Sequence, residues 1–475
     1  MPPFTLLFVN PICLKYKTSS PGNFPEPLTN TSLYFPFFQF ARLTHIEITL
    51  QPFFIDSAME AGDSMVCRRS HKRKLCEDES SRFPLNELNQ DLLERVLSWL
   101  PPSAFFRLTS VCKRWKSVVD SATFRLACSQ VPSRDPWFFM VDSQPHPSHQ
   151  PIVFDSTEGN WKKLNHSPLL QLNQKNRESC KDFIPVAASG GLICFHRADG
   201  EFIVNNPVTA SCRRLNSASR NPQSPIRAIS MMSKAETYKL VLVSGELPNL
   251  TFREYNSTTD EWGEDIVLKR KADRSVETET SDDCTQYFLS KCGNLVSTDI
   301  QRSPAKQYSS ILTLKDGEEI LYFLSSSGTV VACNLTRRFF FEYPRLLPVF
   351  CEYSIDLVGS GGQMHVVLLS EFLETASLRV WTWDDGIQSW RQIAAMPPSI
   401  SHKFYGKKVD INCTAAGKEM LVCLNSGELC SYMMCNLATN EWVELPECNS
   451  NEEGREFVCA FSFEPRIEAS IWGRM

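Results

Sequence analysis

The chain has 475 residues, of which 42% are hydrophobic and 22% charged, and its formal net charge is −5. This length exceeds what one hydrophobic core usually supports, so we expect at least two domains. The negative charge argues against a nucleic-acid partner, and the absence of any apolar run of about 18 residues argues against a membrane partner.

The first 83 residues show no pattern of a packed domain. Residues 1–58 are rich in Pro, Phe, Thr and Ser without a sustained period, and we interpret them as disordered or as a non-native extension ahead of Met59. Residues 59–83 are expected to be a disordered linker, basic at its start and acidic after it. Its run CRRSHKRK (67–74) is either a nuclear localisation signal or a solvated part of the linker.

The 18 cysteines are scattered singly from Cys13 to Cys459, without a CxxC pair and without zinc-ligand spacing. This scatter favours free thiols in a reducing compartment, so we expect the protein in the nucleus, the cytoplasm or both. Of the eight histidines only His146 and His149 are close in sequence, and their Pro-rich surroundings favour a solvated loop. The sequence therefore predicts no bound metal and no cofactor.

Residues 84–130 have the periodicity of short amphipathic helices. Leucines and valines between Gln90 and Leu100 form one apolar stripe, and Pro101-Pro102 ends that helix. We expect Ser103 to cap a short turn and Ser110 to cap the next helix, with a third short helix after it. About 45 such residues bury too little surface to be stable alone, so they either pack on the neighbouring domain or dock on a partner.

The segment LNQDLLERVLSWLPPSAFFRLTSVCKRWKSV (88–118) resembles an F-box, through its leucine pairs, its Leu-Pro break and the following V-C-K-x-W. The resemblance implies binding to the Skp adaptor of a Skp–cullin–F-box ubiquitin ligase. The family usually has Leu-Pro where this chain has Leu88-Asn89, so we expect a less rigid first turn. The positions that match the motif, which include its own core, are Leu88, Leu92, Leu93, Val96, Leu97, Pro101, Val111, Cys112 and Trp115.

From residue 136 onward, short β-type apolar runs replace the helical pattern, for example at 137–141, 191–195, 239–243, 320–324, 364–369 and 420–424. A repeat underlies them, in which Asp or Asn is followed by a turn and then an aromatic residue. The aligned residues Asp155, Asn206, Asn256, Asn334, Asp384 and Asn436 follow one another at steps of 51, 50, 78, 50 and 52 residues.

A period near 50 residues is typical of kelch-type propeller blades. We therefore predict an all-β propeller over residues 136–470, with six blades, or seven if the long step holds an irregular one. The last run, 456–465, is expected to pair near 137–141 and close the ring. The aromatics Trp161, Trp262, Phe340 or Phe341, Trp390 and Trp442 should pack between blades, while the second repeat has Arg213 where Trp is expected.

The whole pattern resembles the plant F-box/kelch-repeat proteins, which are non-catalytic. The resemblance implies a substrate-recognition subunit that binds an unknown target protein with its propeller and a cullin through the Skp adaptor. A scaffold that degrades nothing and a propeller enzyme with a helical prefix remain alternatives. Two segments are candidate recognition loops, the charged insertion 267–284 and the weaker 142–150, although either could be a plain surface loop.

Overall fold

In the computed structural model, helices and strands lie within the unit Ser81–Met475, and the other unit, Met1–Ser80, falls outside the described residues. The predictions of an N-terminal extension, a linker and a basic run concern residues 1–83 and therefore lie outside them. The structure describes residues 88–110, 112–144, 149–164, 183–216, 224–234, 237–271, 287–289, 295–297, 306–326, 328–346, 353–372, 374–448 and 455–472.

The helical part agrees with the sequence in its elements but not in its caps. Ser103 lies inside a helix, because Pro102 occupies the first helical position, where its missing N–H is not needed. Ser110 follows that helix and its hydroxyl donates to the Arg107 carbonyl at 2.7 Å, so it does not cap the next one. The helices are α1 (Gln90–Ser98), α2 (Pro102–Thr109), α3 (Lys113–Val118) and α4 (Ala122–Ser129).

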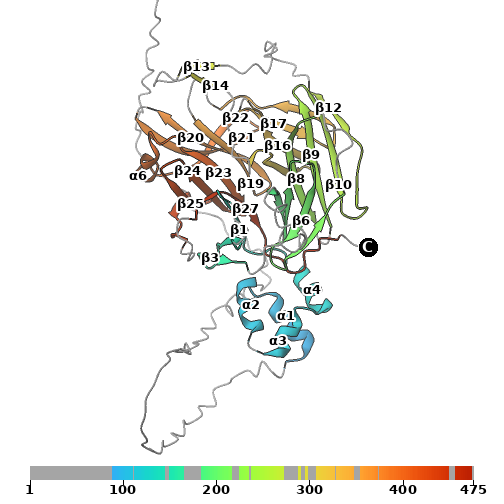
Figure 1. Cartoon of the computed structure of the whole chain (residues 1–475). Helices are drawn as coiled ribbons and strands as arrows, with labels where there is room; N and C mark the ends of the chain where they lie inside the picture. The colour runs from blue at the N-terminus through green and yellow to red at the C-terminus, as the bar shows by residue number, and fades with distance from the viewer. Residues whose placement is uncertain are drawn as a thin grey trace, which may run out of the picture. The chain divides into compact units, whose positions relative to one another are not determined.

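The described strands then form four four-stranded antiparallel sheets, one nine-stranded sheet and a two-stranded hairpin (Figure 1). The nine-stranded sheet consists of two antiparallel parts that are joined where β12 runs parallel to β18. These two parts and the four smaller sheets are numbered below as sheets 1 to 6 in chain order. The six apolar runs singled out in the sequence fall in strands, except that Gly191 lies in the turn before β5. Sheet 1 holds β1 (Trp137–Asp142), β2 (Ile152–Asp155), β3 (Asn160–Lys163) and β27 (Phe457–Phe463), and sheet 2 holds β4 (Ile184–Ser189), β5 (Leu192–His196), β6 (Phe202–Asn206) and β7 (Ser211–Arg214). Sheet 3 holds β8 (Ile226–Lys234), β9 (Thr237–Glu246), β10 (Asn249–Asn256) and β11 (Glu261–Trp262), with β12 (Ile266–Arg270) also on β10.

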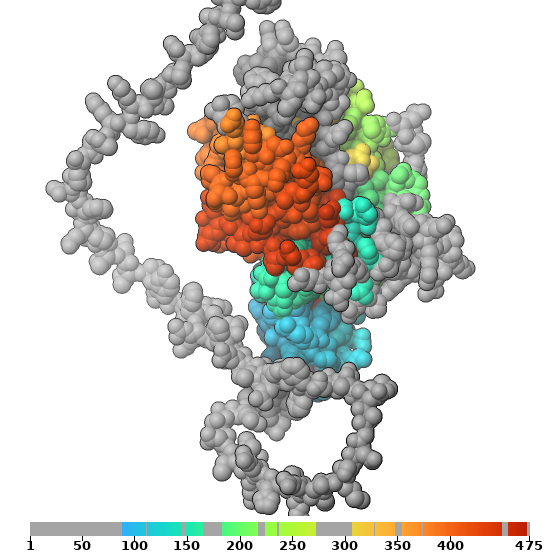
Figure 2. Space-filling view, turned by 60° about the vertical axis from the view of Figure 1, so that its left-hand side comes forward, coloured from blue at the N-terminus to red at the C-terminus, as the bar shows by residue number. Residues whose placement is uncertain are grey.

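The second half of the β region repeats this arrangement, and Figure 2 shows β19–β26 (orange to red) as one continuous block. Sheet 4 holds β15 (Ser310–Lys315), β16 (Glu318–Leu324), β17 (Val330–Asn334) and β18 (Phe339–Glu342), and sheet 5 holds β19 (Tyr353–Ser360), β20 (Gln363–Phe372), β21 (Thr375–Asp384) and β22 (Ser389–Ala395). Sheet 6 holds β23 (Asp410–Ala416), β24 (Glu419–Asn425), β25 (Cys430–Asn436) and β26 (Glu441–Glu444). The remaining elements are the hairpin β13 (Tyr287–Leu289)–β14 (Leu295–Ser297), α6 (Pro398–Ser401) and η4 (His402–Phe404).

The last strand closes the β region onto its first. β27 pairs antiparallel with β1, with Phe461 opposite Phe139, as the sequence predicted for 456–465. The edge strand of each sheet also contacts that of the next, in the circuit β27–β4–β8–β15–β19–β23–β27. These strands are called the inner strands below. Because the circuit returns to its start, it joins the two ends of the β region.

The repeated Asp or Asn residues make the turn that the sequence predicted. Each of the six side chains accepts a hydrogen bond from backbone N–H groups two or three residues further on, between the third and fourth strands of its sheet. The residue four positions on has a positive φ every time, and these residues are Gly159, Ala210, Asp260, Arg338, Gln388 and Asn440. The turn is thus conserved in shape although its sequence varies.

The repeat aromatics pack between neighbouring sheets, also as predicted. Trp161, Trp262 and Trp390 each contact an aromatic ring of the preceding sheet. Each also donates its indole N–H at 2.8 Å to a carbonyl that follows the last strand of that sheet. The acceptors belong to Pro446, Asn216 and Pro344. These tryptophans are partly buried, and they join adjacent sheets by packing against the buried clusters between them.

The strand register corrects the residue aligned in the second repeat, and it decides between Phe340 and Phe341 in the fourth. Trp161 lies opposite Phe154, the residue before the aligned Asp155. In the second repeat the equivalent position, opposite Asn205, is Cys212 and not Arg213. In the fourth it is Phe340, which is fully buried, and not Phe341. The sequence alignment missed Cys212 because the second repeat has no aromatic side chain at this position.

The tight β9–β10 connection yields a stability prediction. Gly245 has φ +108°, and a Cβ on it would lie 2.2 Å from the Asn249 carbonyl oxygen. We expect Gly245→Ala to lower the free energy of unfolding by about 3 kcal/mol, through backbone strain and this clash. Gly317→Ala is the control, because Gly317 also has a positive φ but no atom within 4 Å of its added Cβ. Urea denaturation measures both, and equal losses would contradict the steric argument.

Candidate functional site: the exposed face of helix α1

The four helices surround a small core of their own. Leu93 is 0% exposed, and Leu97 and Trp115 are also buried there. Leu88 and Cys112 pack against this core partly buried. The rings of Phe105 and Phe124 stack in it with centroids 4.9 Å apart. Five of the nine residues that matched the helical motif therefore belong to, or pack on, the interior.

Other apolar residues of the motif point to solvent. Leu92 is 54% exposed and Val96 is 50% exposed, and Trp99, just after the helix, is 62% exposed. Their spacing of four and three residues places them along one side of α1, adjacent to the side that holds Leu93 and Leu97. Leu92, Val96 and Trp99 are called the α1 face below. Pro101 is exposed as well, whereas Val111 lies outside the described residues.

Sequence analysis missed Trp99 as a member of this face. The signal was present, because Trp99 follows Leu92 and Val96 at the i, i+4, i+7 spacing of one helix side. The stripe of five leucines and valines was interpreted as one surface. A helix of two and a half turns has room for two apolar sides, one buried and one exposed, and the structure separates them.

The first turn of α1 is held within the chain. Asn89 caps the helix, and its side-chain oxygen accepts a hydrogen bond from the Asp91 N–H at 3.3 Å. The guanidinium of Arg114 donates to the Leu88 carbonyl at 2.5 Å. The expectation of a less rigid first turn at Leu88-Asn89 therefore finds no support, since Asn89 supplies a cap and α3 anchors the residue before it.

Another side of the helices is attached to the β region. The hydroxyl of Ser103 donates to Glu158 at 2.7 Å, and Arg107 pairs with the same carboxylate at 3.0 Å. Burial raises the pKa of Glu158, but the hydrogen bonds from Ser103 and Lys162 outweigh this and bring it to about 2. Ile467, near the end of the chain, enters the helical core. The helices thus pack on the neighbouring region and still present the α1 face.

Comparison with known proteins assigns this helical segment. The F-box domain family matches residues 85–126, which contain α1, α2, α3 and most of α4. F-box only protein 13 of Arabidopsis thaliana is 49% identical over 420 residues, which cover 84% of this chain and 90% of that protein. The chain belongs to the F-box family. F-box only protein 6 of the same plant is 27% identical over 80% of the chain and 73% of that protein, and an F-box/kelch-repeat protein of the plant is 36% identical over 27% of the chain and 29% of that protein.

The F-box segment precedes a region in which the candidate recognition loops are only partly described. The charged insertion 267–284 begins as strand, because β12 pairs with β10 and runs parallel to β18, where the Lys269 N–H donates to the Arg338 carbonyl at 3.1 Å. Its first residues therefore form part of a sheet, which corrects their assignment to a loop. In the 142–150 loop, Asp142 pairs with Arg455 at 2.6 Å and with His149 at 3.4 Å.

In this F-box protein the described residues offer no group of three or more His, Cys, Asp or Glu side chains suited to a metal ion. None of the described helices is long and apolar enough to span a membrane. The cysteines within the described ranges are free thiols, and burial raises the pKa of most of them, for example that of Cys128 to about 12. Such thiols are weak nucleophiles at neutral pH.

Proposed function

We propose that this F-box protein is the substrate-recognition subunit of a Skp–cullin–F-box ubiquitin ligase. The α1 face carries the proposal, because three large apolar side chains stay exposed on a helix whose other side is fully buried. An exposed apolar patch of this kind marks a protein–protein contact. F-box proteins generally act as substrate adaptors of such ligases, and the match covers the segment that holds the patch.

The burial pattern divides the nine motif residues between two roles. Leu92, Val96 and Pro101 are assigned to the adaptor contact, and Trp99 is added to them. Leu93, Leu97 and Trp115 are assigned to the core of the helices, and Leu88 and Cys112 to its edge. Tryptophan is enriched among the fully desolvated side chains that dominate such contacts, so Trp99 should be a hot spot.

For the β region we infer a kelch-type propeller of six blades. The support is the closed circuit of inner strands, the recurring turn and the pairing of β27 with β1. The long step between Asn256 and Asn334 contains only the hairpin β13–β14 as an additional described sheet, and this hairpin is not part of the circuit. A seventh blade therefore has no counterpart among the described strands.

In this proposal the chain performs no catalysis. The propeller holds a target protein while the adaptor and cullin bring a ubiquitin-loaded enzyme, so the contribution is effective concentration. The place of action would be the nucleus, the cytoplasm or both. A non-degradative scaffold remains the second candidate, and the two differ in whether a protein bound by the propeller accumulates when the ligase is inhibited.

The test is a pull-down of a recombinant Skp adaptor by the full chain and by Leu92→Asp/Val96→Asp. We expect the double variant to bind about 100-fold more weakly, because two carboxylates would have to be desolvated in an apolar contact. Val443→Asp is the control, since Val443 is a similarly exposed valine on β26. Equal binding by the double variant, or no binding by the wild type, would overturn the proposal.

A further inference from the structure

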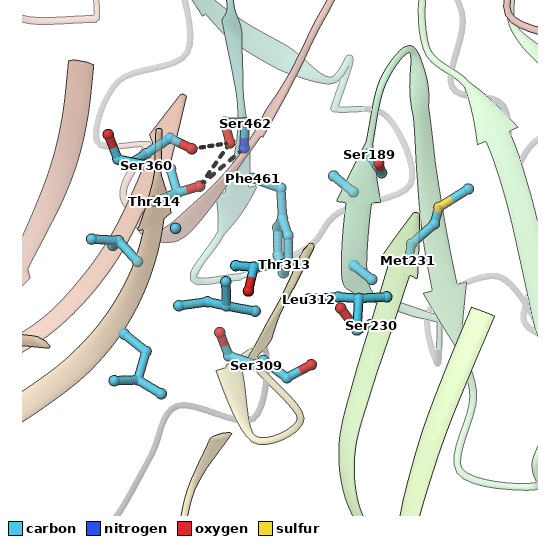
Figure 3. Close-up of a pocket in the computed structure, with 18 of the residues that line it drawn as sticks. Ser189, Ser230, Met231, Ser309, Leu312, Thr313, Ser360, Thr414, Phe461 and Ser462 are labelled. Atoms are coloured by element: carbon cyan, nitrogen blue, oxygen red, sulfur yellow. Dashed lines mark hydrogen bonds between the residues drawn. The ribbon is translucent and has the colours of Figure 1, made fainter. Parts of the chain in front are cut away.

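A cavity of about 420 Å³ lies where the inner strands of the six sheets meet (Figure 3). Every sheet contributes residues to its wall, from β4, β8, β15, β19, β23 and β27. The lining residues are spread along the chain from Val186 to Ser462, so the cavity exists only in the folded protein. Its volume lies within the range of known small-molecule sites, which is roughly 300–1,000 Å³.

Hydroxyl groups are the main polar feature of this cavity. Eight of its described lining residues are serine or threonine, and every inner strand supplies at least one. Apolar side chains fill the space between them, among them Met231, Leu312 and Phe461. One hydroxyl residue from each inner strand is Ser189, Ser230, Ser310, Ser360, Thr414 and Ser462.

The charge of the cavity wall is balanced. Lys306 is the one charged residue among the described lining residues, and it is 5% exposed. Its ammonium donates to the Cys413 carbonyl at 2.6 Å and lies 3.8 Å from the buried carboxylate of Asp356. The lysine charge is thus already paired, so the wall offers no free cation to an anionic ligand and no free carboxylate to a cationic one.

Several of the hydroxyls have structural partners, and two do not. Thr414 and Ser462 join β23 to β27, as Figure 3 marks, and Ser310 donates to the Ile229 carbonyl at 2.9 Å. The side-chain hydroxyls of Ser230 and Ser309 make no hydrogen bond to another described residue, and Ser230 is 4% exposed. Both hydroxyls line the cavity, so they are available to a ligand or to water there.

We propose that the cavity binds a neutral, polyhydroxylated ring compound of the size of a mono- or disaccharide. Serine and threonine hydroxyls both donate and accept, which matches a ligand whose own hydroxyls do the same. The C–H faces of such a ring fit the apolar side chains between the hydroxyls. This site goes beyond the proposed ligase function and does not depend on it.

The test uses saturation-transfer difference NMR on the full chain with D-glucose, sucrose and myo-inositol as separate probes. We expect at least one probe to receive saturation from the wild type. Ser230→Leu/Ser309→Leu should abolish this signal, because two larger side chains fill the cavity. Ser377→Leu is the control, since Ser377 is a half-buried serine on β21 that does not line the cavity.

A milder variant distinguishes loss of binding from misfolding of the leucine variant. Ser230→Ala/Ser309→Ala keeps the volume and removes only the two hydroxyls, and we expect it to weaken binding by roughly tenfold. No signal from any probe with the wild type, or an undiminished signal with both cavity variants, would overturn the proposal. Pull-down of the Skp adaptor should be unchanged in the alanine variant, which separates this site from the α1 face.

Discussion

Replacing Leu93 by aspartate is expected to unfold helices α1–α4, whereas the same change at the neighbouring Leu92 should leave them folded. Leu93 is fully buried among Phe105, Trp115 and Phe124, so the new carboxylate would lie in an apolar core. We expect a loss of more than about 4 kcal/mol, which exceeds what a core of this size can tolerate. Leu92→Asp places its charge in solvent and should cost no more than about 0.5 kcal/mol.

Hydrogen-exchange mass spectrometry on peptides from residues 90–129 measures this difference. In Leu93→Asp these amides should lose protection while the strands keep theirs, and in Leu92→Asp both should stay protected. The two variants should nevertheless both lose the Skp adaptor, one through unfolding and the other through its surface. Retained protection in Leu93→Asp would contradict the division of α1 into a buried and an exposed side.

The second large effect is expected at the buried ion pair of the β region. The Asp356 carboxylate accepts from the backbone N–H groups of Leu357 at 2.8 Å and Cys413 at 2.6 Å. Burial disfavours the Lys306 ammonium, but the carboxylate outweighs this and raises the pKa of Lys306 above its ordinary value. Asp356→Leu leaves this charge buried without its counter-charge and should cost roughly 3–5 kcal/mol.

A double-mutant cycle with Lys306→Met provides the control. In Asp356→Leu/Lys306→Met both charges are gone and apolar side chains of similar size replace them, so much of the lost stability should return. Urea denaturation of the four proteins gives the coupling free energy. Additive losses in the double variant would mean that the pair does not act as a unit and that the cavity wall is not charge-balanced.

Local features were predictable because they depend on neighbours in the sequence. The turn at each aligned Asp or Asn needs only a side-chain oxygen and backbone N–H groups within three residues. The turn could therefore be recognised from the sequence of each repeat alone. The helix boundaries at Pro101-Pro102 follow from the missing N–H of proline. The prediction of the helix caps was wrong where two local signals competed. Ser103 was expected to cap the second helix, but that helix already begins at Pro102.

The sequence by itself determined the F-box segment, the strand-type runs, the period near 50 residues and the pairing of the last run with the first. The tertiary structure decided which leucines are buried, because that depends on α4 and on Ile467, which arrives from the other end of the chain. It also decided that Cys212 takes a tryptophan position and that six distant strands enclose one cavity. Periodicity records which residues share a side of an element, whereas burial and cavities depend on what packs against that side.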